Sequence, residues 1–171
     1  MMVNFTVEEC SDIINLCLEL EGVNRDVNSK NVERPRENIS YTYYNIYKNE
    51  KVEWIFNRIT DYLTHEKNIE VVKPFDVIHL HKYLAGNKFE RHSDIYYPNQ
   101  VLNVGVCLND DYEGGDFILY NPTQSIPKKA GLIYSFKNTT EHEVKEITKG
   151  IRYSLILFLF KDNIRLKNNL I

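Results

Sequence analysis

The 171-residue chain is 43% hydrophobic and 26% charged, a balance typical of one folded domain with a sizeable core. Its formal net charge of −3 argues against tight electrostatic binding to nucleic acid, which needs a concentrated basic face. No apolar run approaches the length of a membrane span, and the first residues do not resemble a signal peptide. Because the three cysteines are odd in number and no leader is evident, we expect a cytoplasmic protein with reduced thiols and no membrane contact.

The first third of the chain predicts two helices and one strand. Thr6-Val7-Glu8-Glu9 has the pattern of a helix start, and the helical spacing that follows ends at Gly22. Residues 23–37 are polar and predict a loop. The run 39–47 is rich in Tyr, Ile and Thr and predicts a strand. Apolar residues at helical spacing predict a second amphipathic helix over residues 49–65.

After residue 70 the pattern changes to strands separated by turns. Helices followed by about six consecutive strands predict an α+β domain, with the strands in a two-sheet sandwich or barrel and the helices on one outer face. We expect the polar tail, 162–171, to fray or to dock as a short helix. The predicted strands are 75–84, 102–108, 116–119, 131–136, 141–147 and 152–160, with turns at 111–115 and 121–129.

Three residues form a candidate metal site. His92 and Asp94 are separated by one residue, so on an extended backbone both side chains point the same way. His142 begins a later strand-like run, which a closed β scaffold can bring beside the first. Two imidazoles and one carboxylate on one face of a metal suit non-haem Fe(II) that activates dioxygen. A His-x-Asp pair alone is weak evidence, since in a loop it is usually solvated, and the third ligand strengthens it.

A candidate anion site lies on the last predicted strand. Arg152 and Ser154 share one face of that strand, and arginine can make a bidentate, charge-assisted pair with a carboxylate. Such a fixed cation suits a dicarboxylic co-substrate. The alternative is an ordinary salt bridge from Arg152 to a nearby acidic residue. Because an apolar run, 155–160, follows directly, a buried Arg152 needs a dedicated partner in either case.

A series of motifs links these two sites in a defined order. The motifs are Tyr83-x-x-Gly86-x-x-Phe89-x-x-His92-x-Asp94, Leu108-Asn109-Asp110, Glu113-Gly114-Gly115-Asp116, Gly131 to Phe136, and His142-Glu143-Val144 through Arg152-Tyr153. In order and spacing they resemble the prolyl 4-hydroxylase branch of the Fe(II)/2-oxoglutarate-dependent dioxygenases. The resemblance covers about residues 72–161, and the opening segment 5–18 is similar to that family's first helix.

The resemblance implies a fold and a ligand set. It implies one dioxygenase domain over residues 1–171, with 1–70 as mainly helical support and 71–161 as the catalytic core. That core is a double-stranded β-helix, or jelly roll, with the helices packed on one face. The implied Fe(II) ligands are His92, Asp94 and His142.

The resemblance also implies a co-substrate site. The distal carboxylate of 2-oxoglutarate is expected to meet Arg152, with Tyr83 as a hydrogen-bond partner and Ser154 in support. Asn103 is expected to face the co-substrate, and ascorbate is an optional reductant. Collagen-type prolyl hydroxylases usually carry lysine in place of Arg152, which loosens the case for a collagen-like peptide.

The predicted function is hydroxylation of an unactivated C–H bond with dioxygen, releasing succinate and carbon dioxide. We expect the substrate to be a prolyl residue in a peptide or protein. Within the same class, the alternatives are a free amino acid, another small molecule or a nucleobase, and the acidic balance disfavours a nucleic-acid demethylase. The alternative of another class is a non-catalytic, metal-binding jelly-roll interaction module. Residues 23–37 and 95–100 are candidate lids.

Overall fold

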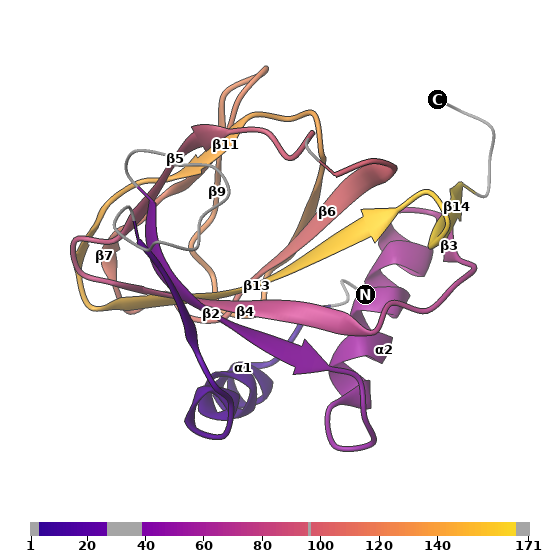
Figure 1. The fold of residues 1–171 in the computed structure, drawn as a ribbon, viewed down its shortest axis with the longest axis horizontal. Coiled ribbons are helices and arrows are strands. Elements are labelled where there is room, and N and C mark those ends of the chain that lie inside the picture. The colour runs from indigo at the N-terminus through magenta and orange to yellow at the C-terminus, as the bar shows by residue number, and fades with distance from the viewer. Residues whose placement is uncertain (1–3, 27–38, 96, 167–171) are drawn as a thin grey trace.

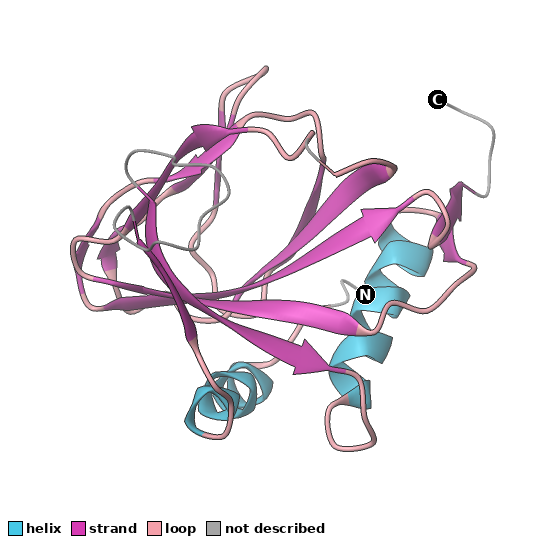
Figure 2. Cartoon of the chain, in the orientation of Figure 1, coloured by secondary structure: helices cyan, strands magenta, loops and turns pink. Residues whose placement is uncertain are grey.

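One antiparallel sheet, curled until its two halves face each other, dominates the fold. The computed structural model describes residues 4–26, 39–95 and 97–166. Within these ranges the sheet has ten strands, and two helices pack on the outside of one half (Figures 1 and 2). The arrangement confirms the predicted jelly roll with helices on one face. None of the described helices has the length and apolar character needed to span a membrane.

The strand order explains how the sheet closes. Along the sheet, β2 is the junction, because Ile39 and Ser40 pair with β5 whereas Thr42 to Tyr47 pair with β4. One half therefore runs β10-β6-β13-β4-β2, the other runs β5-β11-β8-β9, and β1 pairs with β2 at its other edge. The bounds are β1 Val23–Asp26, β2 Ile39–Tyr47, β4 Val77–Leu84, β5 Lys88–His92, β6 Gln100–Cys107, β8 Phe117–Leu119, β9 Gln124–Ile126, β10 Ile133–Lys137, β11 His142–Val144 and β13 Ile151–Phe160.

Two short ladders and two helices complete the described chain. Strand β7 (Glu113–Gly114) pairs with β12 (Ile147–Lys149), and β3 (Ile69–Val71) pairs with β14 (Ile164–Leu166). Helix α1 (Val7–Asn15) continues as a 3-10 turn to Leu18, and α2 (Glu53–Asp61) continues as a π-helical turn to Glu66. The capping box predicted at Thr6 is present.

Strand β13 shows how the sheet separates the two cores. Its alternate residues Leu155, Leu157 and Leu159 are buried in the larger core, which lies between the helices and the β6-β13-β4-β2 half. Arg152 and Ser154 point the other way, into the space between the two halves. There a smaller core surrounds them, formed by Tyr83, Cys107, Phe117, Ile126, Tyr134, Phe136, Val144 and Ile147.

Several expected boundaries differ from the observed ones. Residues 23–26, expected as part of a loop, form β1, because their backbone pairs with β2 although their side chains carry no apolar pattern. The remainder of that loop, 27–38, lies outside the described residues. The turn 121–129 contains β9, and the tail, expected to fray or form a helix, contributes β14. The core sheet also takes β1 and β2 from the first 70 residues, so it begins before residue 71.

Candidate metal centre and co-substrate pocket

The three predicted metal ligands lie together at the mouth of the jelly roll. His92 ends β5 and His142 begins β11, and the two residues are direct partners across this strand pair. Asp94 follows β5 by two residues, and its backbone N–H donates to the carbonyl of Asn138 at 2.9 Å. The ligand atoms of His92, Asp94 and His142 all lie within 4.8 Å of one another. The site therefore combines residues that are 50 positions apart in sequence because β5 and β11 are neighbours.

Backbone carbonyls orient both imidazole rings. The Nδ1 atom of His92 lies 2.7 Å from the carbonyl oxygen of Glu90, and that of His142 lies 3.0 Å from the carbonyl oxygen of Thr140. A carbonyl can only accept, so each Nδ1 carries a proton, which in the neutral ring leaves the lone pair of Nε2 for a metal. Each Nε2 lies 3.6 Å from an oxygen of the Asp94 carboxylate. Two neutral nitrogens and one anionic oxygen fit a divalent cation such as Fe(II).

Aromatic rings pack around the two histidines. Phe89 stacks on His92 with ring centres 4.0 Å apart, and Phe136 lies 4.7 Å from the ring of His142. Phe117 lies 5.6 Å from the same ring. These contacts restrict the rotation of the imidazoles and keep water from one side of the candidate metal centre.

Deeper between the two halves, Arg152 is a buried cation. Its side chain is 2% exposed, Nη1 donates to Ser154 Oγ at 2.9 Å, and its guanidinium carbon lies 5.3 Å from the centre of the Tyr83 ring. Among the described residues no carboxylate pairs with Arg152, and its Nε–H has no hydrogen-bond partner. Burial works to lower the pKa of Arg152, but the nearby phenols, Tyr134 foremost, raise it, so the group stays charged. The salt-bridge alternative is therefore not observed.

Tyr134 is a second unpaired donor in the same pocket. Its hydroxyl is buried and has no hydrogen-bond partner among the described residues. Burial raises the pKa of Tyr134, with a smaller opposing effect of Arg152, so the phenol stays protonated. Gly105, the direct partner of Tyr134 on β6, makes room for the ring, because a Cβ there would lie 2.2 Å from Tyr134 Cζ. A buried guanidinium and a buried phenol with unused donors fit a carboxylate ligand.

Part of this pocket could be predicted from the sequence. Tyr83 and Arg152 are direct partners between β4 and β13, and Ser154 holds the guanidinium, so these three predicted residues do meet. Asn103, predicted to face the co-substrate, donates from Nδ2 to Asp94 Oδ2 at 2.6 Å. Tyr134 was not anticipated. A glycine inside an apolar strand signals a close approach, but the Gly105–Tyr134 pairing had to be known to identify the partner.

Fold and site together define a class of enzyme. A jelly roll that carries two histidines and a carboxylate at its mouth, with a buried arginine behind them, is the architecture of an Fe(II)/2-oxoglutarate-dependent dioxygenase. The family model of the 2OG-Fe(II) oxygenase superfamily matches residues 78–160, which include every site residue described above. Residues 78–160 thus match a superfamily whose cofactor and co-substrate are Fe(II) and 2-oxoglutarate.

Solved structures share the fold at low sequence identity. A prolyl-4-hydroxylase from Pseudomonas putida superposes with a TM-score of 0.70 at 15% identity, covering 94% of this chain and 91% of that chain. A prolyl hydroxylase from Trichoplax adhaerens, in complex with a peptide fragment of the hypoxia inducible factor oxygen degradation domain, gives 0.70 at 19% identity, covering 89% and 76%. A 2OG-Fe(II) oxygenase family oxidoreductase from Burkholderia pseudomallei gives 0.70 at 16%, covering 95% and 84%. A comparison with curated proteins finds no match.

Proposed function

We propose that this dioxygenase hydroxylates a prolyl residue in a peptide or protein. The observation that carries the oxygenase chemistry is the combination, in one barrel, of the His92–Asp94–His142 cluster with the unpaired donors of Arg152 and Tyr134. The substrate assignment is supported by the order of the sequence motifs and by the prolyl hydroxylases among the structures that share the fold.

In this proposal the mouth of the barrel holds the metal. The Nε2 atoms of His92 and His142 and the carboxylate of Asp94 would hold Fe(II), a ligand set that suits iron that activates dioxygen. Together the bound iron and 2-oxoglutarate supply the oxidising chemistry, in which dioxygen is consumed, 2-oxoglutarate becomes succinate and carbon dioxide, and one oxygen atom enters the substrate C–H bond.

The pocket behind the metal holds the co-substrate. Arg152 pairs with the distal carboxylate, and Ser154 fixes the rotation of the guanidinium through Nη1. Tyr134 donates its phenol hydrogen to the same carboxylate, adding to the donors predicted from the sequence. Because the surrounding residues are apolar or aromatic, the charge pair forms away from water and is correspondingly strong.

The role of Arg152 can be separated from that of the metal ligands. Arg152→Ala should weaken 2-oxoglutarate binding to the Co(II)-loaded protein by at least about 100-fold, because a buried charge pair is lost. The Co(II) affinity of this variant should stay within about threefold of the wild-type value, because Arg152 is not one of the residues that bind the metal. Calorimetric titration measures both. An unchanged 2-oxoglutarate affinity would remove Arg152 from the co-substrate site.

The substrate is tested with peptides. Protein purified without oxygen and loaded with Fe(II) is exposed to air with 2-oxoglutarate and a proline-containing peptide, or with the same peptide carrying alanine in place of proline. We expect succinate formation stimulated by the first peptide only, a mass gain of one oxygen on that peptide, and loss of both in His142→Ala. Succinate formation that no peptide stimulates, together with oxygen insertion into a free amino acid or nucleobase, would replace the prolyl assignment.

A further inference from the structure

Two buried amide side chains lead to the candidate metal ligand Asp94. Gln100 donates from Nε2 to Asn103 Oδ1 at 2.6 Å, and Asn103 donates from Nδ2 to Asp94 Oδ2 at 2.6 Å. Both amides belong to β6, where Gln100 is 3% exposed and Asn103 is fully buried. The carboxylate at the mouth of the barrel is thus joined to the strand behind it by two consecutive hydrogen bonds.

These two hydrogen bonds, from Gln100 to Asn103 and from Asn103 to Asp94, form what we call the relay. Its direction follows from the negative charge of the Asp94 carboxylate. A carboxylate only accepts hydrogen bonds, so Asn103 must turn its NH₂ group toward Asp94. The side-chain oxygen of Asn103 then faces Gln100, so Gln100 must donate a hydrogen bond to it from its own NH₂ group. The orientation of both amides is therefore set by Asp94.

The relay leaves one polar atom unsatisfied. Gln100 Oε1 is buried and has no hydrogen-bond partner among the described residues. A buried carbonyl oxygen without a partner destabilises the folded state, and the hydrogen bond from Gln100 Nε2 to Asn103 offsets this cost only in part. Packing alone does not account for an amide at this position, whereas orienting Asn103 does.

We propose that Gln100 and Asn103 are positioning residues that hold Asp94 as a one-oxygen ligand of the metal. Oδ1 lies 3.6 Å from His92 Nε2 and Oδ2 lies 3.6 Å from His142 Nε2, but Oδ2 also accepts the hydrogen bond from Asn103. Because that bond takes up one lone pair of Oδ2, it favours Oδ1 as the oxygen that binds the ion. A carboxylate restrained in this way does not take up a second coordination position, which stays open for the co-substrate or dioxygen. The inference rests on the proposed metal centre, and it assigns Asn103 to the ligand Asp94 in place of the co-substrate role predicted from the sequence.

The test uses Co(II) as the probe and two substitutions that remove the amides. Asn103→Leu should weaken Co(II) binding about 10- to 100-fold, and Gln100→Leu about 3- to 10-fold, as is typical for partners of metal ligands. Gln100→Leu in the Asn103→Leu background should cause no further loss, because Gln100 acts through Asn103. The visible d–d bands of bound Co(II) should weaken in Asn103→Leu, since a released Asp94 can add a second oxygen and a higher coordination number lowers their intensity.

Thermal unfolding of the metal-free protein separates positioning from a structural role. Gln100→Leu removes the unsatisfied Oε1 but leaves Asn103 Oδ1 without its donor, so we expect a small decrease in melting temperature together with the loss of Co(II) affinity. A lower melting temperature with unchanged Co(II) affinity would overturn the proposal. Gln124→Leu, the same change at an exposed position on β9, is the matched control and should alter neither value.

His92→Ala distinguishes failure of this inference from failure of the metal centre. If His92→Ala binds Co(II) as the wild type does, the metal centre itself is misassigned. If His92→Ala loses Co(II) while Asn103→Leu and Gln100→Leu keep wild-type affinity and spectra, the metal centre stands and the relay is wrong.

Discussion

At the scale of single residues, the barrel interior contains a cation that no acidic side chain in the described part of the chain neutralises. Arg152 is held by Ser154 and surrounded by Tyr83, Phe117 and Tyr134, and burial of an unpaired charge is costly. The cost is offset only when an anion enters. A dicarboxylic co-substrate would therefore bind to a pocket already arranged for its carboxylate.

Removal of one hydroxyl tests the contribution of Tyr134. Tyr134→Phe keeps the ring in the space above Gly105 but removes the unpaired donor. We expect 2-oxoglutarate to bind the Co(II)-loaded variant about 10-fold more weakly, as is typical for loss of a hydrogen bond to a charged group, with Co(II) affinity unchanged. Tyr47→Phe, at an exposed site on β2, is the control. Equal 2-oxoglutarate affinity in both variants would place Tyr134 outside the carboxylate site.

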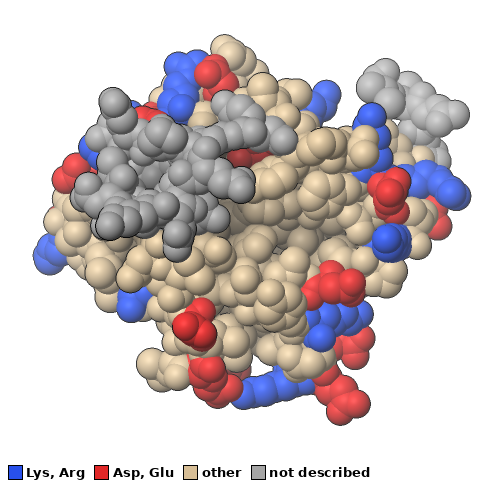
Figure 3. All heavy atoms as spheres, viewed as in Figure 1, with Lys and Arg blue, Asp and Glu red and all other residues tan. Residues whose placement is uncertain are grey.

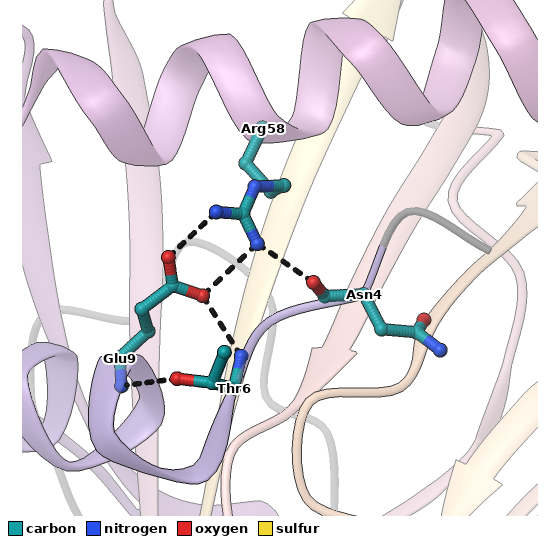
Figure 4. A network of polar contacts seen from close by, with 4 residues as sticks. All are labelled: Asn4, Thr6, Glu9 and Arg58. Carbon is teal, nitrogen blue, oxygen red and sulfur yellow. Dashed lines mark hydrogen bonds and ion pairs between the residues drawn. The ribbon is translucent and has the colours of Figure 1, made fainter. Parts of the chain in front are cut away.

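At the scale of elements, a network of hydrogen bonds around Glu9 and Arg58 connects α1 to α2 (Figure 4). Glu9 closes the capping box of α1, since Oε2 accepts from the Thr6 N–H at 2.8 Å. The same carboxylate accepts two hydrogen bonds from Arg58 on α2, at 2.9 and 2.6 Å. Arg58 also donates to the carbonyl of Asn4 at 2.7 Å and covers the Phe5 ring. One guanidinium therefore connects the start of α1 to α2, and both helices pack against the sheet that positions the site.

Arg58→Met measures how much this connection stabilises the fold. Both side chains of the Arg58–Glu9 pair are less than one-third exposed, so its loss should lower the free energy of unfolding by about 1–2 kcal/mol, between the values for exposed and buried pairs. Urea denaturation gives the value. Lys51→Met is the control, because Lys51 pairs with Glu19 and both are more than half exposed, and we expect a change below about 0.5 kcal/mol. A similar small change in Arg58→Met would mean that apolar packing alone docks α1.

At the scale of the whole molecule, the two halves of the sheet are joined through β2 and separated by the site. In the described part of the face shown in Figure 3, acidic and basic side chains are interspersed, and no broad basic area is visible. The larger core stabilises only the helix-covered half, whereas the other half contributes the ends of β5 and β11 that carry the metal ligands. A metal bound at this point joins β5 to β11 in the half that the larger core does not support, and it should stabilise the folded state.

Metal binding should therefore raise the stability of the protein. At a Co(II) concentration about 100 times its dissociation constant, the free energy of unfolding should increase by about 2.7 kcal/mol, because the ion binds the folded state alone. Thermal unfolding with and without Co(II) measures the shift, and a chelator should reverse it. His142→Ala should show no shift. A shift of equal size in that variant would locate the ion elsewhere.

Alkaline pH should destabilise the whole domain through buried thiols. Burial raises the pKa of Cys10 to about 11, above the ordinary thiol value. The stabilising contribution is complete below pH 9 and is lost as pH rises through the folded-state pKa, because the unfolded chain releases this proton more readily. For Cys10 alone the loss between pH 8 and pH 10 is about 1 kcal/mol. Urea denaturation should show that loss reduced by this amount in Cys10→Ala, and an identical pH dependence in both proteins would contradict it.

Much of the architecture could be predicted because its signals are local. The capping box at Thr6, the alternation along β13 and the strand-rich second half follow from neighbouring residues, and the structure agrees with them. The strands that were not expected are all short and contain polar residues, namely β1, β3, β5, β7, β9 and β14. Among them, β1 pairs with the following strand β2, β9 pairs with the neighbouring β8, and β14 pairs with the distant β3, but none of β1, β9 and β14 has an apolar pattern that predicts a strand.

The same distinction holds for the site. The sequence by itself determined its chemistry, because His92, Asp94 and His142 are the residue types that Fe(II) requires, and a charge before an apolar run demands a special partner. Only the tertiary structure decided that Tyr134 lies over Gly105 beside Arg152 and that Gln100 and Asn103 lead to Asp94. These contacts depend on which strands become neighbours and on the direction in which each side chain points within the barrel. Residues adjacent along the chain do not determine either property.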